Sequence, residues 1–184
     1  LAAAKNMKGL ARIGASMQSF HQPTLENIKR KNHTLETISS MSEELSENNL
    51  KLYSELILGL PFETKESHIK GIKQLMDVNA EIFNFNLHLL PGTELESKQS
   101  RRKYIKKVGF RMFDGCYGIY EGRKVIEGEE VVVATNTMPE NDLRDFRFIH
   151  FLIQFMWSKE FYLDFLNVFK SEGMHPVDIM LEIE

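Results

Sequence analysis

Apolar residues in the first half of the chain recur with two alternating periods. Alternation by twos predicts three short β-strands, at 10–20, 51–60 and 81–90. Apolar residues at helical spacing predict three helices, at 24–32, 34–48 and 64–79. Strands and helices that alternate at these lengths predict βαβ units, with parallel strands and right-handed crossovers. The first half is therefore expected to be α/β.

The second half has a different pattern. A basic helix at 97–109 is followed by a glycine-rich stretch, which predicts a short β-meander, or a hairpin followed by the strand VVVAT. Beyond Met138-Pro139, two strongly apolar helices are expected, at about 140–157 and 159–172. We therefore expect a boundary near residue 100, with a half-barrel at 1–100 and an extension of mixed β-hairpin and helices at 101–184.

Each predicted strand has one polar and one apolar face. The polar positions are Ser16, Gln18, Tyr53, Glu55, Asn84, Asn86 and His88. A parallel sheet is normally apolar on both faces because helices cover both, so this asymmetry predicts one helix-covered face and one wet face. A partial (β/α) barrel of the TIM type, whose lumen holds a polar ligand, fits the pattern. Ligands in such folds bind at the carboxyl ends of the strands.

Single members of this set also have simpler explanations. Asn84, Asn86 and His88 could be satisfied polar groups of a core, or lie on an exposed sheet face. Glu55 is harder to explain, because a carboxylate in the middle of a strand is costly unless it is paired. The run Lys29-Arg30-Lys31 is typical of a solvated helix end.

Composition narrows the possible chemistry. The 184 residues carry 23 Lys+Arg against 26 Asp+Glu, and this near balance argues against broad electrostatic binding to nucleic acid or to an anionic membrane. The single cysteine, Cys116, cannot form an internal disulfide or build a metal cluster alone, so a reducing, cytoplasmic setting is expected. No stretch reaches the roughly 18 uninterrupted apolar residues of a membrane span. The spacing of the histidines predicts no metal site, and the chain has no GxSxG motif.

The strand ends carry a recognisable order of motifs. SMQSF, a helix that ends in IKRKN, YSELILGLPFET and NFNLHLLPGTELE follow one another, and CYGIYEG and EEVVVATNTM extend the likeness to about residue 138. In this order and spacing they resemble the second half of the radical S-adenosylmethionine barrel, above all in enzymes with an N-terminal cobalamin-binding domain. GLPFET after Ile57 is similar to the family's fifth-strand signature, which ends in Gly-Leu-Pro-Gly-Glu-Thr. Phe62 stands where the family usually has glycine, which puts a backbone contact at that position in doubt.

The resemblance implies roles for individual residues. Polar positions that touch the ribose or amino-acid part of S-adenosylmethionine match Ser16 and Gln18, and Ile57 matches the residue that packs on adenine. Backbone groups near His88 match those that meet the adenine edges. The full set implied to bind the cofactor is Ser16, Gln18, Ile57, Gly59, Glu63, Thr64, His88, Leu89, Leu90 and Pro91. Candidates for contact with an unidentified substrate are Glu55, Asn84 and Asn86.

The resemblance also implies cofactors whose ligands lie outside this chain. The family's CxxxCxxC loop, which holds a 4Fe–4S cluster, is not present in the sequence, and neither is the cobalamin-ligand segment. We therefore expect the C-terminal portion of a radical S-adenosylmethionine enzyme, inactive alone. Its expected partner is the rest of the same protein, with the cluster-binding half-barrel and a cobalamin domain. The expected chemistry begins with a 5′-deoxyadenosyl radical, and methyl transfer that uses cobalamin is one plausible outcome.

Two other interpretations stay open on the residues alone. The first is a non-catalytic α/β interaction domain that docks a partner through the aromatic helices at 140–172. An exposed apolar surface on those helices, with no cleft beside Ser16, Ile57 and Leu90, would favour it. The second is a different barrel enzyme with a phosphate ligand, and it ranks last because the chain lacks a Gly-rich phosphate turn.

Overall fold

A three-stranded parallel sheet organises the first half of the molecule. The computed structural model describes residues 13–183, so positions 10–12 of the first predicted strand lie outside the described residues. The strands are β1 (Ile13–Gly14), β2 (Leu52–Leu58) and β3 (Glu81–Asn86), in the order β1-β2-β3. Both pairings are parallel, which confirms the predicted α/β class and the three parallel strands.

Helices connect the strands and cover one face of the sheet. The helices of this half are α2 (Gln22–Asn27), α3 (Leu35–Ser46) and α4 (Lys65–Asp77). The side chains of Thr34 and Thr64 begin α3 and α4, because each accepts a hydrogen bond from the backbone N–H three residues further on. Apolar residues of α3 and α4 share one buried core with the Leu56 side of β2.

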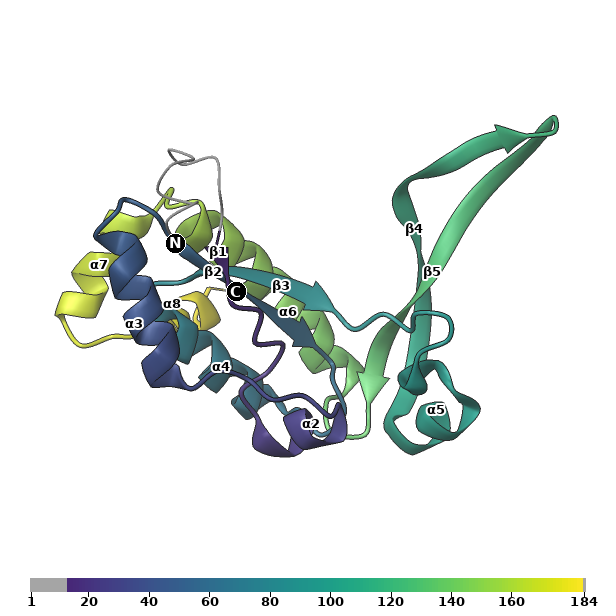
Figure 1. Cartoon of the computed structure of the whole chain (residues 1–184), viewed down its shortest axis with the longest axis horizontal. Coiled ribbons are helices and arrows are strands. Elements are labelled where there is room, and N and C mark those ends of the chain that lie inside the picture. Colours follow the sequence, from purple (N-terminus) through teal and green to yellow (C-terminus); the bar gives the residue numbers. More distant parts are fainter. Residues whose placement is uncertain (1–12, 184) are drawn as a thin grey trace.

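A long antiparallel hairpin follows the sheet, which confirms the predicted hairpin over the alternative of a short meander. After β3 come η1 (Glu94–Glu96) and α5 (Lys98–Tyr104), and then the hairpin strands β4 (Ile105–Tyr120) and β5 (Arg123–Thr135). The basic helix is thus shorter than predicted, because its last residues belong to β4. Figure 1 shows the hairpin projecting from the body of the molecule. At its base, Val132 N–H donates to Leu87 O at 2.8 Å, and Leu89 N–H donates to Glu130 O at 3.0 Å.

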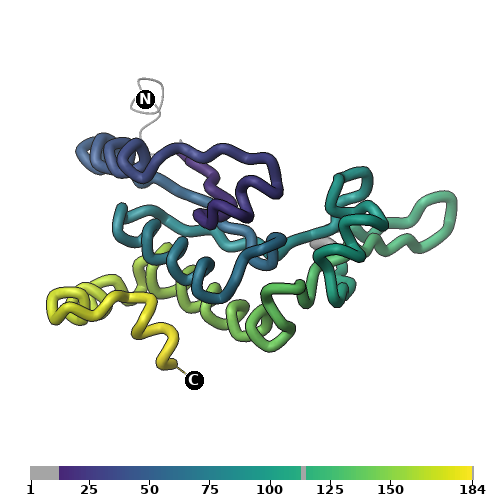
Figure 2. The backbone as a smooth tube through the Cα atoms, turned by 90° about the horizontal axis from the view of Figure 1, so that it is seen from below, coloured from purple at the N-terminus to yellow at the C-terminus, as the bar shows by residue number. Residues whose placement is uncertain are grey.

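The C-terminal extension packs on the sheet. Its elements are α6 (Glu140–Leu152), the π-helix η2 (Ile153–Ser158), α7 (Leu163–Ser171) and α8 (Pro176–Leu181). The sequence pattern predicted the first three as two helices and missed α8. Figure 2 shows these helices, in green to yellow, on the side of α4 away from α3. Their buried side chains, including Phe146 and Trp157, belong to the same core as β2 and β3. The boundary near residue 100 stays a prediction.

The π-helix η2 covers the beginning of β3. The Ser158 hydroxyl accepts a hydrogen bond from Ile82 N–H and donates one to Ile82 O, each at 3.0 Å. The Trp157 indole donates to Ala80 O at 2.8 Å. All of these groups are buried, so η2 satisfies backbone atoms that would otherwise lack partners. In residues 13–183, no helix combines the length and the apolar character needed to cross a membrane.

Candidate cofactor site at the carboxyl ends of the strands

Ser16 and Glu55 form a polar pair on the face of the sheet that the helices leave open. Ser16 Oγ donates a hydrogen bond of 2.6 Å to Glu55 Oε2. Side chains alternate along β2, so Tyr53, Glu55 and Ile57 share this half-buried face, while Ser54 and Leu56 between them are buried. The mid-strand carboxylate therefore has a partner that offsets the cost of its burial.

The register of β3 corrects the predicted wet face. Residues paired in a parallel ladder point to the same face, and Glu55 pairs with Phe83 whereas Leu56 pairs with Asn84. Phe83 and Phe85 therefore lie on the open face. Asn84 and Asn86 lie on the helix-covered face, whereas His88 lies beyond the end of β3, beside the hairpin. The prediction that one wet face carries the polar side chains of all three strands is wrong.

A bulge interrupts the alternation between Ser16 and Gln18. Gly14 pairs with Tyr53, but Gln18 pairs with Leu56, so β1 has one residue more than β2 over this stretch. Gln18 has a φ of 64°, in the left-handed region, as is typical where a strand end is redirected. Its backbone stays in the ladder, because Gln18 N–H donates to Glu55 O and Ile57 N–H donates to Gln18 O, each at 2.8 Å.

The loop after α2 holds the end of β1 through two side chains. Asn32 Nδ2 donates to Met17 O at 2.8 Å and to Ser19 O at 2.7 Å. The Arg30 guanidinium donates to Ser16 O. The sequence reasoning took this basic run for a solvated helix end, and it gave no signal that Arg30 and Asn32 bond backbone atoms more than ten residues away.

The turn after β2 has two residues in the left-handed region. Gly59 has a φ of 89° and Phe62 a φ of 68°. A left-handed conformation at Phe62 explains why glycine is common at this position of the related motif, since glycine adopts it without steric cost. The Phe62 ring contacts the edge of Tyr104, with 5.7 Å between the ring centroids. Tyr104 in turn accepts a hydrogen bond of 2.7 Å from Asn27.

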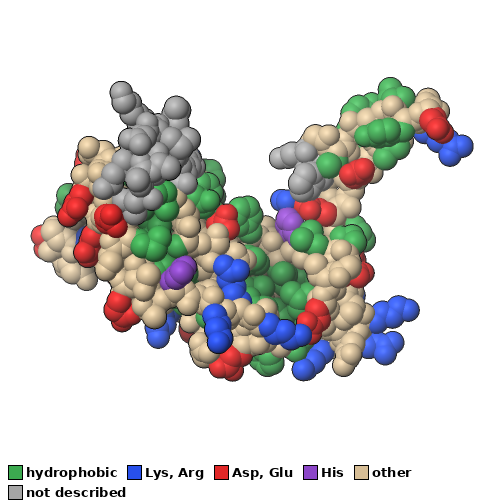
Figure 3. Space-filling model, viewed as in Figure 1, with side chains coloured by type: hydrophobic (Ala, Val, Ile, Leu, Met, Phe, Trp, Pro, Cys, Tyr) green, Lys and Arg blue, Asp and Glu red, His purple; other side chains and the backbone are tan. Residues whose placement is uncertain are grey.

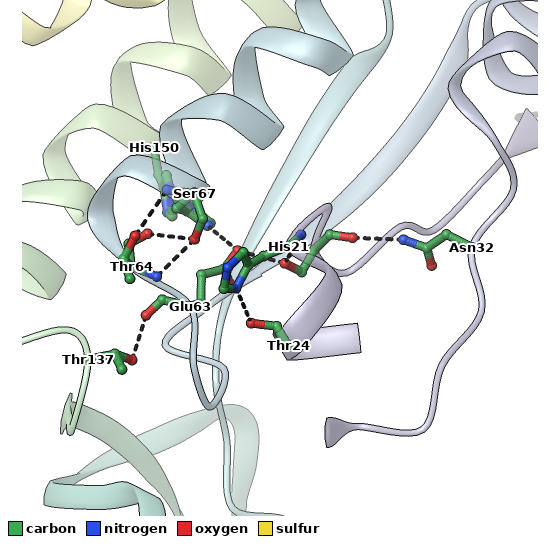
Figure 4. A network of polar contacts seen from close by, with 10 residues as sticks. His21, Thr24, Asn32, Glu63, Thr64, Ser67, Thr137 and His150 are labelled. Atoms are coloured by element: carbon green, nitrogen blue, oxygen red, sulfur yellow. Dashed lines mark hydrogen bonds and ion pairs between the residues drawn. The ribbon is translucent and has the colours of Figure 1, made fainter. Parts of the chain in front are cut away.

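Glu63, which the resemblance places among the cofactor-binding residues, is buried in a polar network (Figure 4). Its side chain is 1% exposed, and its Oε1 accepts a hydrogen bond of 2.7 Å from Ser19 Oγ. Its backbone carbonyl accepts another from Thr137 Oγ1 at 2.7 Å. Thr64 forms a capping box with Ser67 at the start of α4. The described contacts of both side chains are structural, and cofactor binding by them stays a prediction.

The network continues through two histidines. His68 Nε2 lies 2.9 Å from His150 Nε2, and His68 Nδ1 lies 3.7 Å from Glu63 Oε1. Burial, and then the neighbouring His68, hold the pKa of His150 well below its usual value. The network thus joins the end of β1, the turn after β2, α4 and α6.

The segment after β3 pairs with the hairpin. His88 forms a bridge with Val131, and its Nδ1 lies 3.3 Å from Glu129 Oε2. Burial, with help from the neighbouring Arg111, holds the pKa of His88 below its usual value, although the nearby Glu129 acts to raise it. Leu89 is buried, and its N–H already bonds β5, whereas Leu90 is 53% exposed. Contact of His88, Leu89, Leu90 and Pro91 with a cofactor stays a prediction.

A cavity and an exposed apolar face lie at this edge of the molecule. A cavity of about 290 Å³ between α2 and α5 is lined in part by Ile28, Glu94 and Lys103. Figure 3 shows a hollow between the helical body and the hairpin, and hydrophobic side chains along the hairpin. Among residues 13–112 and 115–183, whose side chains the structure describes, no group of three or more His, Cys, Asp or Glu is placed to hold a metal ion.

Comparisons with known proteins show that the chain is similar to methyltransferases. No protein-family model matches the chain. The chain is 32% identical, over 158 residues, to the cobalamin-dependent radical SAM methyltransferase TokK of Streptomyces tokunonensis; these residues are 84% of this chain and 23% of that protein. It is 30% identical, over 145 residues, to the 2-(S-pantetheinyl)-carbapenam-3-carboxylate methyltransferase of Streptantibioticus cattleyicolor; these residues are 77% of this chain and 21% of that protein. Both relatives are methyltransferases. The chain spans about a fifth to a quarter of the length of these curated relatives.

Proposed function

We propose that this chain is the C-terminal portion of a radical S-adenosylmethionine enzyme that transfers a methyl group with the help of cobalamin. The observation that carries the proposal is the similarity, over 84% of the chain, to a cobalamin-dependent radical SAM methyltransferase. The parallel strands, whose carboxyl ends meet at one edge, give the geometry in which such folds bind ligands.

The open face of the sheet fits an adenosine group. Ile57 is half-buried there, and its register partner Phe85 is 47% exposed, so an apolar surface is available to a flat purine ring. The hydrogen-bonded pair Ser16–Glu55 lies on the same face, with Glu55 two residues before Ile57 in β2. In this position the pair could bond the hydroxyls of a ribose. In this proposal Ile57 and Ser16 orient S-adenosylmethionine, and the sheet excludes water from one side of it.

The described residues do not fit the iron–sulfur cluster. A 4Fe–4S cluster with one iron open to S-adenosylmethionine is held by three cysteine thiolates. The chain has one cysteine, Cys116, in the hairpin. In the complete protein, cysteines outside this chain would hold the cluster, which would supply the electron for the reductive cleavage of S-adenosylmethionine. We place the ligands of the cluster, and those of cobalamin, in the remainder of the protein, which is also the proposed partner of this chain.

Anaerobic reconstitution tests the proposal. The full-length protein, treated with iron and sulfide and then reduced, should show a 4Fe–4S spectrum and release 5′-deoxyadenosine from S-adenosylmethionine. The 184-residue chain, treated in parallel, should show neither. A stable cluster in the chain alone would overturn its proposed inactivity, and a full-length protein that binds no S-adenosylmethionine would overturn the family.

A second candidate function is favoured by an aromatic surface on the extension. The rings of Phe151, Phe155, Phe161 and Tyr162 lie in contact, with centroids 4.9–5.8 Å apart, and each is at least 38% exposed. An exposed apolar patch of this kind is typical of a docking surface, so the chain would serve as an interaction domain. When the chain and the rest of the protein are produced as two polypeptides, Phe161→Ser should lower their co-purification. An unchanged yield would contradict docking through this surface.

A further inference from the structure

A row of buried polar side chains connects the C-terminal extension to the end of β1. Ser19 bonds Glu63, Glu63 faces His68, and His68 contacts His150 on α6. Ser19 is fully buried, and Glu63 and His68 are each 1% exposed, so the contacts among these three side chains are shielded from water. Figure 4 shows the network between α4, α6 and the turn after β2. Residues 82 positions apart in the sequence thus meet beside the candidate site.

The short distance between the two histidines fixes the position of a proton. At 2.9 Å, one Nε2 atom must carry a hydrogen and the other must accept it, because two N–H groups or two lone pairs would repel. If a neutral His68 carried its hydrogen on Nε2, the bare Nδ1 would face the Glu63 carboxylate at 3.7 Å. A hydrogen on Nδ1 of His68 would place a donor opposite Glu63 Oε1, whether His150 donates to His68 Nε2 or accepts from it.

We propose that His68 and His150 are positioning residues for the candidate site, an inference that rests on the proposed function. Nδ1 of His68 faces Glu63 Oε1 at 3.7 Å, and the same oxygen of Glu63 accepts the hydrogen bond of the Ser19 hydroxyl. Ser19 directly follows Gln18, whose backbone bonds Glu55 and Ile57 in β2. The extension thereby supplies, through His150, part of the support for the strand end that binds S-adenosylmethionine.

Hydrogen bonding and packing make opposite predictions for two substitutions. His150→Gln keeps an N–H donor and a carbonyl acceptor near His68, whereas His150→Leu keeps the apolar volume and removes both. Positioning by a hydrogen bond predicts that glutamine preserves the site and that leucine does not. A role in packing alone predicts the reverse order, because burying an amide costs more than burying a leucine. His33→Leu, at an exposed histidine before α3, serves as the control.

Two measurements on the 184-residue chain test the inference directly. Nitrogen-15 NMR of the histidine rings should show a hydrogen on Nδ1 of His68, and an unprotonated Nδ1 would overturn the proposal. Hydrogen exchange at the amides of Gln18 and Ile57 should be faster in His150→Leu, and close to wild type in His150→Gln and His33→Leu. Equal exchange in the two His150 variants, or faster exchange in the glutamine variant, would also overturn it.

A third measurement connects the network to the ligand. In the reconstituted full-length protein, His150→Leu should weaken the binding of S-adenosylmethionine by about three- to tenfold, roughly the effect of one lost hydrogen bond. His150→Gln should restore most of the affinity, and equal affinity in the two variants would contradict the positioning role. If the wild-type protein binds no S-adenosylmethionine, the proposed function fails, while the NMR and exchange results still decide the role of the histidines.

Discussion

Replacing Gly59 by alanine is expected to destabilise the fold more than the same change at Gly92. Both glycines have a positive φ, 89° and 82°, a backbone conformation that costs a residue with a side chain about 1–2 kcal/mol. Alanine also lowers the conformational entropy of the unfolded chain, and this stabilises the folded state by about 0.4–1 kcal/mol at either site. A Cβ at Gly92 would meet no atom within 4 Å, so Gly92→Ala should cost only about 1 kcal/mol.

Gly59 carries a second cost, from packing. An added Cβ would lie 3.1 Å from Cδ2 of Leu143, which is 1% exposed in the main core. Overpacking of a core typically costs about 1–3 kcal/mol. The free energy of unfolding should therefore fall by about 2–4 kcal/mol in Gly59→Ala.

Urea unfolding followed by circular dichroism separates the two costs. With a slope of about 2–3 kcal/mol/M, the extra 1–3 kcal/mol should place the midpoint of Gly59→Ala roughly 0.3–1.5 M below that of Gly92→Ala. Shortening the neighbour, in Gly59→Ala combined with Leu143→Val, should cost less than the sum of the two single changes. Equal midpoints for the two alanine variants would refute the argument that Leu143 limits the space at Gly59.

Three further outcomes follow from the contacts of the site. Ser16→Ala should lower the free energy of unfolding by about 1–2 kcal/mol, because Glu55 loses its hydrogen-bond donor; Ser16→Thr, which keeps the hydroxyl, should lose less, and equal losses would contradict this role. Burial holds the pKa of His150 below the 6.5 of the unfolded chain, so the unfolded state binds more protons and stability should fall as the pH drops through 6.5, by up to about 1.4 kcal/mol per pH unit. His150→Gln should flatten that slope in urea titrations, and an unchanged slope would exclude His150 as its source. Phe62→Gly should change the thermal midpoint little, because relief of about 1–2 kcal/mol of backbone strain is offset by the flexibility of glycine and the lost Tyr104 contact; a large loss would show that the ring contact dominates.

The elements of the parallel sheet could be predicted from the sequence, but the faces of its strands could not. Alternation gives the relative faces within one strand, and it correctly separated Glu55 from Leu56 in β2. It does not say which face of the next strand aligns with which. The register placed Phe83 beside Glu55, where its ring contacts Tyr53 with 5.8 Å between centroids, and this turned Asn84 to the helices.

Contacts over long sequence separations account for most of the rest. Nothing local to His68 or His150 indicates that they meet, because α6 reaches α4 only when the extension folds onto the sheet. The contact of Arg30 with the backbone carbonyl of Ser16 could not be predicted for the same reason. The sequence does not distinguish an arginine that bonds a distant carbonyl from one that is solvated. The turn at GLPFET could be predicted more easily from sequence, because Gly59 favours the left-handed backbone conformation that it adopts there. Phe62 also adopts a left-handed conformation in this turn.

The hydroxyl of Ser158 has a consequence for how the sheet can grow. By bonding both backbone groups of Ile82, it blocks the start of the outer edge of β3, and the pairing of Leu87 with Val132 occupies the end. Among the described residues, β1 pairs only with β2. A parallel strand contributed from elsewhere in the protein would therefore add beside β1, so the sheet can be enlarged in one direction only.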